Sequence, residues 1–176
     1  MSPSFHSLTA RILMTVPPGP GPSSREVIVL LLEDLSSQLT DAPDDPDLRR
    51  LRPPAYPDDA EADEAYQLLA GEELRTSHRE AVRSVIASLE RKQVTEEELW
   101  AWLRALNSVR LVAGTRLDIT DDDHGPLGRP RQGDLSEQER SLWAVYDFCT
   151  YLQYEVVKGL AELRAMAAEK RSHRGE

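Results

Sequence analysis

Hydrophobic residues recur at helical spacing through most of the chain, and the prolines mark where helices are interrupted. Ten of the twelve prolines lie at or before Pro57, so residues 58–125 and 131–176 contain none. Proline lacks an amide proton and clashes with the preceding helical turn, whereas a proline-free stretch can remain helical. The pattern therefore predicts an all-α fold, a single-domain bundle of about five helices.

Three helices are expected in the first half of the bundle. The first begins near Ser24, a suitable N-cap, and carries apolar residues at helical spacing to about residue 39. Asp45 and Pro46 favour a single helical turn with proline at its first position. Two further helices are predicted over about 60–70 and 72–92, separated by Gly71 because glycine is a common helix stop.

Two capping boxes give the clearest helix starts. In Thr95-Glu96-Glu97-Glu98 and Ser136-Glu137-Gln138-Glu139, the first hydroxyl and the last carboxylate can each satisfy a backbone amide of the other residue. The helices they open are expected to run to about residues 117 and 168. Gly114 and Gly159 interrupt these helices, and we expect them to allow close helix approach.

The predicted helical domain spans residues 24–168. It follows an extended arm rich in proline and glycine, residues 1–23, and precedes a basic tail, residues 169–176. A helix over 136–168 would be about 50 Å long, whereas a compact chain of this size is about 40 Å across. We therefore expect the end of the last helix to protrude or fray.

Charge excludes simple nucleic-acid binding. The chain has 31 acidic and 21 basic residues, a net charge of −10, and no large segment is net basic, whereas a nucleic-acid backbone requires a basic surface. Its longest apolar run is far shorter than the about 20 residues of a membrane span, and its first residues lack a basic signal region. The single cysteine excludes an internal disulfide and a cysteine-based metal cage. These features predict a cytoplasmic protein with no membrane or nucleic-acid partner.

Several spaced motifs resemble one family. The longest is the run WLRALNSVRLVAGTRLDITDDD, which begins at Trp102 and ends at Asp123. The shorter ones are Asp45-Pro46, Arg50-Leu51, Pro54-Ala55-Tyr56, Leu74-Arg75, Tyr146-Asp147-Phe148, Leu152-Gln153 and Val156-Val157. Together, over about residues 25–161, they resemble an uncharacterised actinobacterial family, the domain of unknown function DUF2017. The 18 arginines against three lysines agree with an origin in a high-GC genome.

The resemblance implies little chemistry, because no reaction is established for the family. Members often lie in genomes near the gene of a Clp protease adaptor, and some carry the label of transcriptional regulator. Ser108, Phe148 and Tyr154 depart from the residues expected of the family, and so does the amino-terminal arm. The chain therefore resembles a divergent member.

One polar cluster could bind a ligand. One edge of the predicted helix carries Asn107, Arg110, Gly114 and Asp118. An amide, a guanidinium and a carboxylate group are therefore expected close together, beside the glycine. This arrangement could grip a carboxylate or a phosphate. Alternatively, Arg110 and Arg116 pair across the bundle with acids of the last helix, Asp147 or Glu155, and such structural ion pairing is the commoner explanation.

No metal or cofactor site is predicted. The acids at 118 and 121–123 lack the glycine and the final glutamate of a calcium loop, so a solvated helix exit is favoured over a cation site. The four histidines show no paired ligand spacing, and His78 is in line with apolar residues, as expected for a packed histidine. Cys149 lies on the apolar stripe of the last helix and is expected to be an inert core residue.

The aromatic residues of the last helix extend beyond the stripe that one core requires. Trp143, Tyr146, Tyr151 and Tyr154 could therefore form a protein interface, because tyrosine and tryptophan are enriched at protein contacts. A central helix surrounded by its own bundle would explain the same residues.

These observations favour a non-enzymatic interaction or regulatory module with an unidentified protein partner, which could also be a second copy of the chain. An adaptor linked to protein turnover would fit what the resemblance implies. One alternative is a transcriptional regulator, which only the family label supports. The other is a small-molecule-binding or catalytic bundle that uses Asn107, Arg110 and Arg116.

Overall fold

A computed structural model describes residues 23–91, 94–120, 130 and 132–172. Its elements are α2 (Ser24–Asp41), the 3-10 helix η1 (Pro46–Leu51), α3 (Ala60–Ser88), α4 (Glu96–Arg116), the 3-10 helix η2 (Gln132–Asp134) and α5 (Glu137–Ser172). The described residues contain no strand, and the predicted all-α fold is confirmed. Several expected features lie outside the described residues: residues 1–22 of the arm, the acids at 121–123, three of the histidines (His6, His124 and His173) and the end of the tail.

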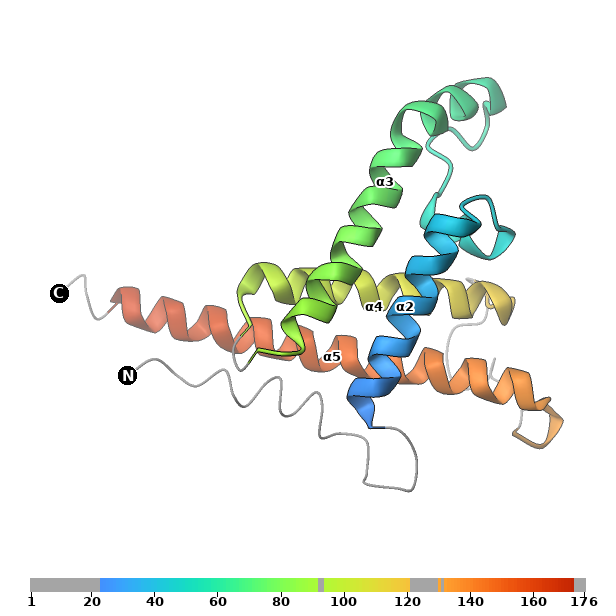
Figure 1. The fold of residues 1–176 in the computed structure, drawn as a ribbon. Coiled ribbons are helices and arrows are strands. Elements are labelled where there is room, and N and C mark those ends of the chain that lie inside the picture. The colour runs from blue at the N-terminus through green and yellow to red at the C-terminus, as the bar shows by residue number, and fades with distance from the viewer. Residues whose placement is uncertain (1–22, 92–93, 121–129, 131, 173–176) are drawn as a thin grey trace.

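The helices form two crossing layers. Helices α4 and α5 run antiparallel along one another, while α2 and α3 cross them (Figure 1). Helix α4 is central, because it packs against α5, α3, α2 and η1. Helix α5 extends past α4 at its C-terminal end (Figure 1), as its predicted length required.

Capping boxes begin three of the helices. Those at Thr95 with Glu98 and at Ser136 with Glu139 are confirmed by reciprocal hydrogen bonds. The first helix is capped by Ser23, one residue before the predicted cap, because only Ser23 has a glutamate three residues later. The side-chain hydrogen bond from Ser23 holds the pKa of Glu26 below its ordinary value.

The predicted helix stop at Gly71 is wrong. Helix α3 runs without a break through this residue, from Ala60 to Ser88. Glycine inside a helix costs only about 1 kcal/mol relative to alanine, and no proline is present to enforce a break. The helix also ends earlier than predicted, with Leu89 as its C-cap.

Buried polar groups connect the helices at the core. Trp102 of α4 is buried, and its indole Nε1 donates to the Ser88 hydroxyl 2.8 Å away, which in turn donates to the carbonyl of Val85. The half-buried His78 of α3 has Nδ1 2.9 Å from Ser108 Oγ. These contacts confirm the prediction of a packed histidine, and burial lowers the pKa of His78.

Gly114 allows a close approach, but it does not face Gly159. A Cβ at Gly114 would lie 3.5 Å from Cε2 of Tyr146 and 3.4 Å from Nη1 of Arg50. Because α4 and α5 are antiparallel, with Arg164 of α5 bonded to Glu96 at the start of α4, Gly159 lies toward the opposite end of this pair. The space beside Gly114 is therefore occupied by the side chains of Arg50 and Tyr146.

No helix among the described residues is long and apolar enough to cross a membrane.

Candidate functional site

The N-terminal part of α3 and the loop before it project from the other helices (Figure 1). We refer to residues 53–74 as the α3 tip. The Asp59 side chain caps α3 by accepting from the amide of Ala62, and the Asp63 carboxylate accepts from the amides of Ala55, at 2.7 Å, and Tyr56, at 3.2 Å. The ring of Tyr56 meets that of Tyr66 edge to face. These contacts fold the loop back onto its own helix.

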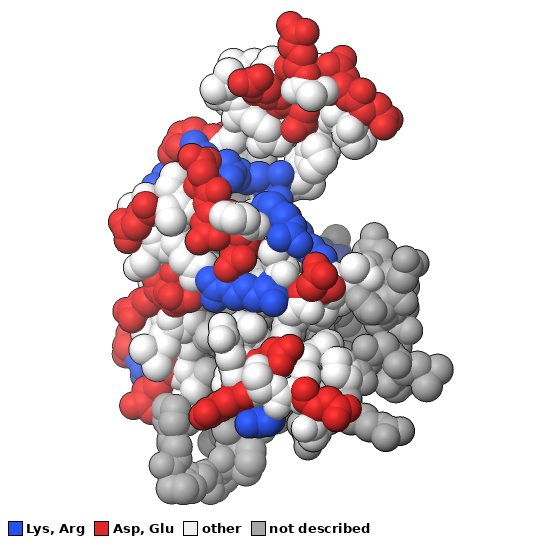
Figure 2. All heavy atoms as spheres, turned by 90° about the vertical axis from the view of Figure 1, so that its right-hand side faces the viewer, with Lys and Arg blue, Asp and Glu red and all other residues white. Residues whose placement is uncertain are grey.

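The α3 tip exposes large apolar side chains. Leu68 has 79% of its surface exposed and Leu69 has 85%, and Tyr56 is exposed as well. The tip is also acidic: it contains seven aspartate and glutamate residues and no lysine or arginine. Figure 2 shows these carboxylates at the projecting end of the molecule.

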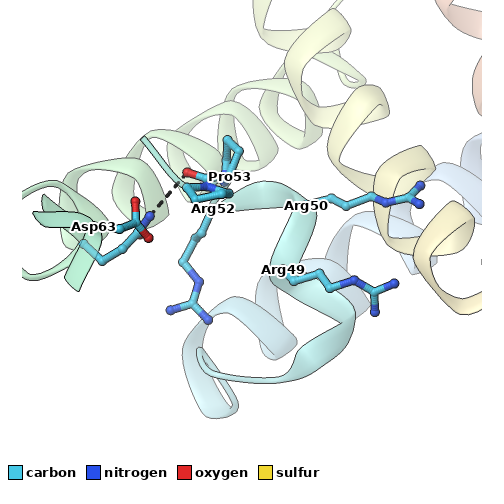
Figure 3. Close-up of a pocket in the computed structure, with 7 residues that line it drawn as sticks. Arg49, Arg50, Arg52, Pro53 and Asp63 are labelled. Carbon is cyan, nitrogen blue, oxygen red and sulfur yellow. Dashed lines mark hydrogen bonds between the residues drawn. The ribbon is translucent and has the colours of Figure 1, made fainter. Parts of the chain in front are cut away.

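A cavity of about 460 Å³ lies at the base of the α3 tip, where η1 meets α3. Its lining residues are Arg49, Arg50, Arg52, Pro53, Pro54, Asp63 and Gln67 (Figure 3). We call it the arginine cavity. Figure 2 shows basic side chains gathered in the hollow beneath the acidic end.

The three arginines of the cavity make different contacts. Arg49 and Arg50 extend toward α4, while Arg52 points in another direction (Figure 3). Arg50 donates to the carbonyl of Ile119, and Arg49 lies 3.9 Å from the Asp118 carboxylate. Arg52 bonds the Asp44 carboxylate at 3.0 Å through Nη1, whereas its buried Nε has no hydrogen-bond partner among the described residues.

The predicted polar cluster is partly assembled. Arg110 donates to Asn107 Oδ1 at 3.1 Å, and its guanidinium carbon lies 5.8 Å from the centre of the Tyr146 ring. The Trp143 ring packs edge to face against the same tyrosine. These side chains therefore hold α4 against α5, and neither of the two described cavities is lined by them.

Arg116 bonds to η1 and α2, and Asp118 lies close to Arg49 of η1. Arg116 Nε pairs with Asp47 at 2.6 Å and its Nη2 donates to Gln38 Oε1 at 3.1 Å. Asp118 is exposed and has a positive φ of 51° at the end of α4. The end of α4 is thus held to η1 by Asp47 and to α2 by Gln38, neither of which is among the partners expected from the sequence.

The two acids of α5 that were expected to pair with the arginines differ in exposure. Asp147 is exposed and has an interaction partner, and Glu155 is buried. The four aromatic residues of the candidate interface differ in exposure. Trp143 and Tyr146 are half-buried near the start of α5, whereas Tyr151 and Tyr154 are exposed farther along it.

A second cavity of about 420 Å³ lies between α3 and α4. Two of the charged residues that line it, Arg91 and Glu98, are already paired with each other. No group of three histidine, cysteine, aspartate or glutamate residues in the described part of the chain is placed to hold a metal ion. Cys149 is buried, which raises the pKa of its thiol to about 12 and leaves the group protonated.

Sequence reasoning did not find the arginine cavity. The family motifs include Arg50, Pro54 and Tyr56, but no pattern in the sequence indicates that η1 lies beside residues 63 and 67 of α3. The available signal was local: Arg49, Arg50 and Arg52 form the densest basic stretch ahead of an acidic segment.

Comparison with known protein families identifies a match that covers most of the chain. The family model described as Domain of unknown function (DUF2017) matches residues 5–160. The match includes most of the amino-terminal arm, which lies outside the motifs that carry the resemblance. No curated protein and no solved structure matches the chain.

Proposed function

The chain belongs to the DUF2017 family, and we propose that it is a non-enzymatic interaction module whose α3 tip docks on a partner protein. The observation that supports this proposal is the exposure of the adjacent residues Leu68 and Leu69 on a projecting helix. Burying one leucine side chain is worth about 1.5–3 kcal/mol, so a partner that covers both would gain substantial binding energy.

The contacts of the α3 tip favour a preformed docking surface. Asp63 holds the loop through two amides, and Gln67 Nε2 donates to the carbonyl of Pro53 at 3.3 Å. A surface that is already ordered loses less conformational entropy when it binds. The tip can therefore present Leu68 and Leu69 without first folding on the partner.

Charge specifies the chemistry of the partner. Because the α3 tip has seven carboxylates and no basic residue, a complementary surface would offer an apolar pocket with lysine or arginine at its rim. Amphipathic helices commonly insert into apolar grooves of this kind. In this proposal the protein acts in the cytoplasm as an adaptor, and its partner belongs to protein turnover.

A pull-down with matched variants tests this proposal. Tagged wild type, the double variant Leu68→Ser/Leu69→Ser and the control Leu30→Ser would be incubated with nuclease-treated native lysate. Leu30 is a suitable control because it has 61% of its surface exposed but lies on α2. Circular dichroism would confirm that all three proteins are folded.

The proposal predicts one protein retained in near-equal amount by wild type and Leu30→Ser, and lost from the double variant. Added salt should weaken its retention because the rim contacts are ionic. Equal retention by all three proteins would contradict the assignment to the α3 tip, and so would retention by none. Light scattering tests whether the partner is a second copy of the chain. If wild type is a dimer and the double variant is a monomer, the partner is a second copy and not a separate protein.

A further inference from the structure

We propose that the outward side of α5 is the interface of a homodimer, on which a second copy of the chain docks in antiparallel orientation. The α3 tip is unsuitable for such a contact, because its seven carboxylates would meet the same charges on the other copy. The dimer interface is therefore a second surface, and its occupation does not depend on the partner proposed for the α3 tip.

Six exposed residues of α5 share its outward side. They recur at alternating intervals of three and four residues, which is the spacing of the a and d positions of a coiled coil: Ala144, Asp147, Tyr151, Tyr154, Lys158 and Ala161. We call them the outer α5 face. Tyr154 has 64% of its surface exposed and Tyr151 has 40%, whereas Leu152 and Val156, on the other side of α5, are buried in the core. Helix α5 lies at an edge of the helix arrangement (Figure 1).

The order of residues on the outer α5 face is self-complementary. In a two-fold symmetric contact, two antiparallel helices pair residues that lie at equal distances on either side of the axis. An axis midway between Tyr151 and Tyr154 pairs each of these tyrosines with the other tyrosine of the second copy. The same axis pairs Asp147 with Lys158 of the second copy, because each lies four residues beyond a tyrosine. Opposite charges therefore meet at both ends of an aromatic centre.

The side chains of the outer α5 face fit a close contact between two helices. Ala144 and Ala161 are paired by the same axis, and their small side chains do not hold the helices apart. At the centre, tyrosine rings can bury about 150–250 Å² each. Val157, which is 53% exposed and one turn from Tyr154, widens the apolar area. This apolar centre is smaller than the interface of an obligate dimer, so we expect a reversible dimer.

Charge favours a second copy over an unrelated protein as the occupant. Two copies of a chain whose net charge is −10 repel each other, so they associate most readily where the facing charges balance. The outer α5 face carries one acid, Asp147, and one base, Lys158, and its formal charge is therefore zero. Asp147 already has an interaction within the chain, and Lys158 of the second copy would add to this contact.

Charge reversals in the intact chain test this interface. Lys158→Glu sets two acids opposite each other at both ends of the contact, and Asp147→Lys sets two bases opposite each other. The matched control is Arg83→Glu, because Arg83 is an exposed arginine of α3, outside the outer α5 face. Sedimentation velocity over a range of protein concentrations measures the dissociation constant of the dimer, and circular dichroism confirms that each variant is folded.

With rising concentration, the wild type should shift from 19.8 kDa to twice that mass, and Arg83→Glu should behave in the same way. We expect each reversal on α5 to weaken dimerisation about tenfold or more, because like charges then face each other. An equimolar mixture of Lys158→Glu with Asp147→Lys should dimerise again, since every charged pair of the mixed dimer joins unlike charges.

Three results would overturn the proposal. The first is a wild type that stays monomeric up to about 0.1 mM, where a micromolar complex would be saturated. The second is a mixture of the two reversal variants that does not dimerise. The third is a dimer that Leu68→Ser/Leu69→Ser dissociates, which would place the contact at the α3 tip. If a reversal variant fails to fold, Tyr154→Ser replaces it, because this exposed side chain is not part of the core. It should also weaken dimerisation about tenfold or more, and an unchanged dissociation constant would contradict the assignment to α5.

Discussion

Replacing Gly71 with alanine should stabilise the protein. Gly71 lies inside α3, and a Cβ at this residue would have only the ends of two flexible side chains near it, Arg75 Nη1 at 3.9 Å and Gln67 Oε1 at 4.0 Å. These are ordinary van der Waals distances, so the new methyl group fits without displacing its neighbours. Steric strain therefore does not oppose the gain in helix propensity.

The magnitude follows from the helix. Alanine is favoured over glycine by about 1 kcal/mol in a helix interior, mainly because it restricts the unfolded chain. For a chain of this size, 1 kcal/mol raises Tm by about 2–4 °C. The matched control is Ala70→Gly, the neighbouring residue in the same helix, which should lower the free energy of unfolding by about the same amount.

Urea unfolding followed by circular dichroism at 222 nm measures both variants. Opposite changes of similar size are expected, with unchanged slopes of free energy against urea concentration. If Gly71→Ala leaves stability unchanged or reduces it, α3 is interrupted at Gly71, as the sequence had indicated. The α3 tip would then not be a rigid extension of the helix that packs on α4.

Three other perturbations have defined outcomes. Ser88→Ala should reduce the free energy of unfolding by about 1–3 kcal/mol, because the buried Trp102 Nε1 loses its acceptor. Urea unfolding would measure this change. An unchanged free energy of unfolding would show that the hydrogen bond does not contribute to stability. Burial in the folded state lowers the pKa of His78 below its ordinary value of 6.5, so protonation of this histidine favours the unfolded state. The stability that neutral His78 contributes is present above pH 6.5 and is lost as the pH falls below 6.5. His78→Gln should therefore flatten the acid side of the stability profile, and an unchanged profile would assign that slope to other groups. The pKa of the Cys149 thiol is raised to about 12, so a disulfide reagent at pH 8 should modify it only as the protein unfolds, and rapid modification of the folded protein would show that α5 opens locally.

The helix starts could be predicted from the sequence because their signals are local. Thr95 with Glu98 and Ser136 with Glu139 satisfy each other's amides within four residues, so no distant contact is needed to define them. The stop at Gly71 could not be judged in this way. Whether a helix continues through a glycine depends on what packs around it, which is a property of the assembled fold.

The candidate sites needed the tertiary structure for the same reason. Arg116 lies 69 residues from its partner Asp47 in the sequence, and no periodic pattern connects the two. Leu68 and Leu69 look like ordinary helical core residues until the arrangement of the helices shows that α3 extends beyond the bundle at that point. The resemblance to DUF2017 was readable from spaced motifs, but the match extends toward the N-terminus, to residue 5.

Site-specific photocrosslinking in living cells tests the central claim, that the α3 tip is a docking surface for a partner protein, most directly. A photoreactive phenylalanine derivative would replace Leu69 in one strain and the comparably exposed Leu30 of α2 in another. The account predicts one discrete crosslinked protein from residue 69 and none from residue 30. No crosslink at residue 69, or the same products from both residues, would contradict it.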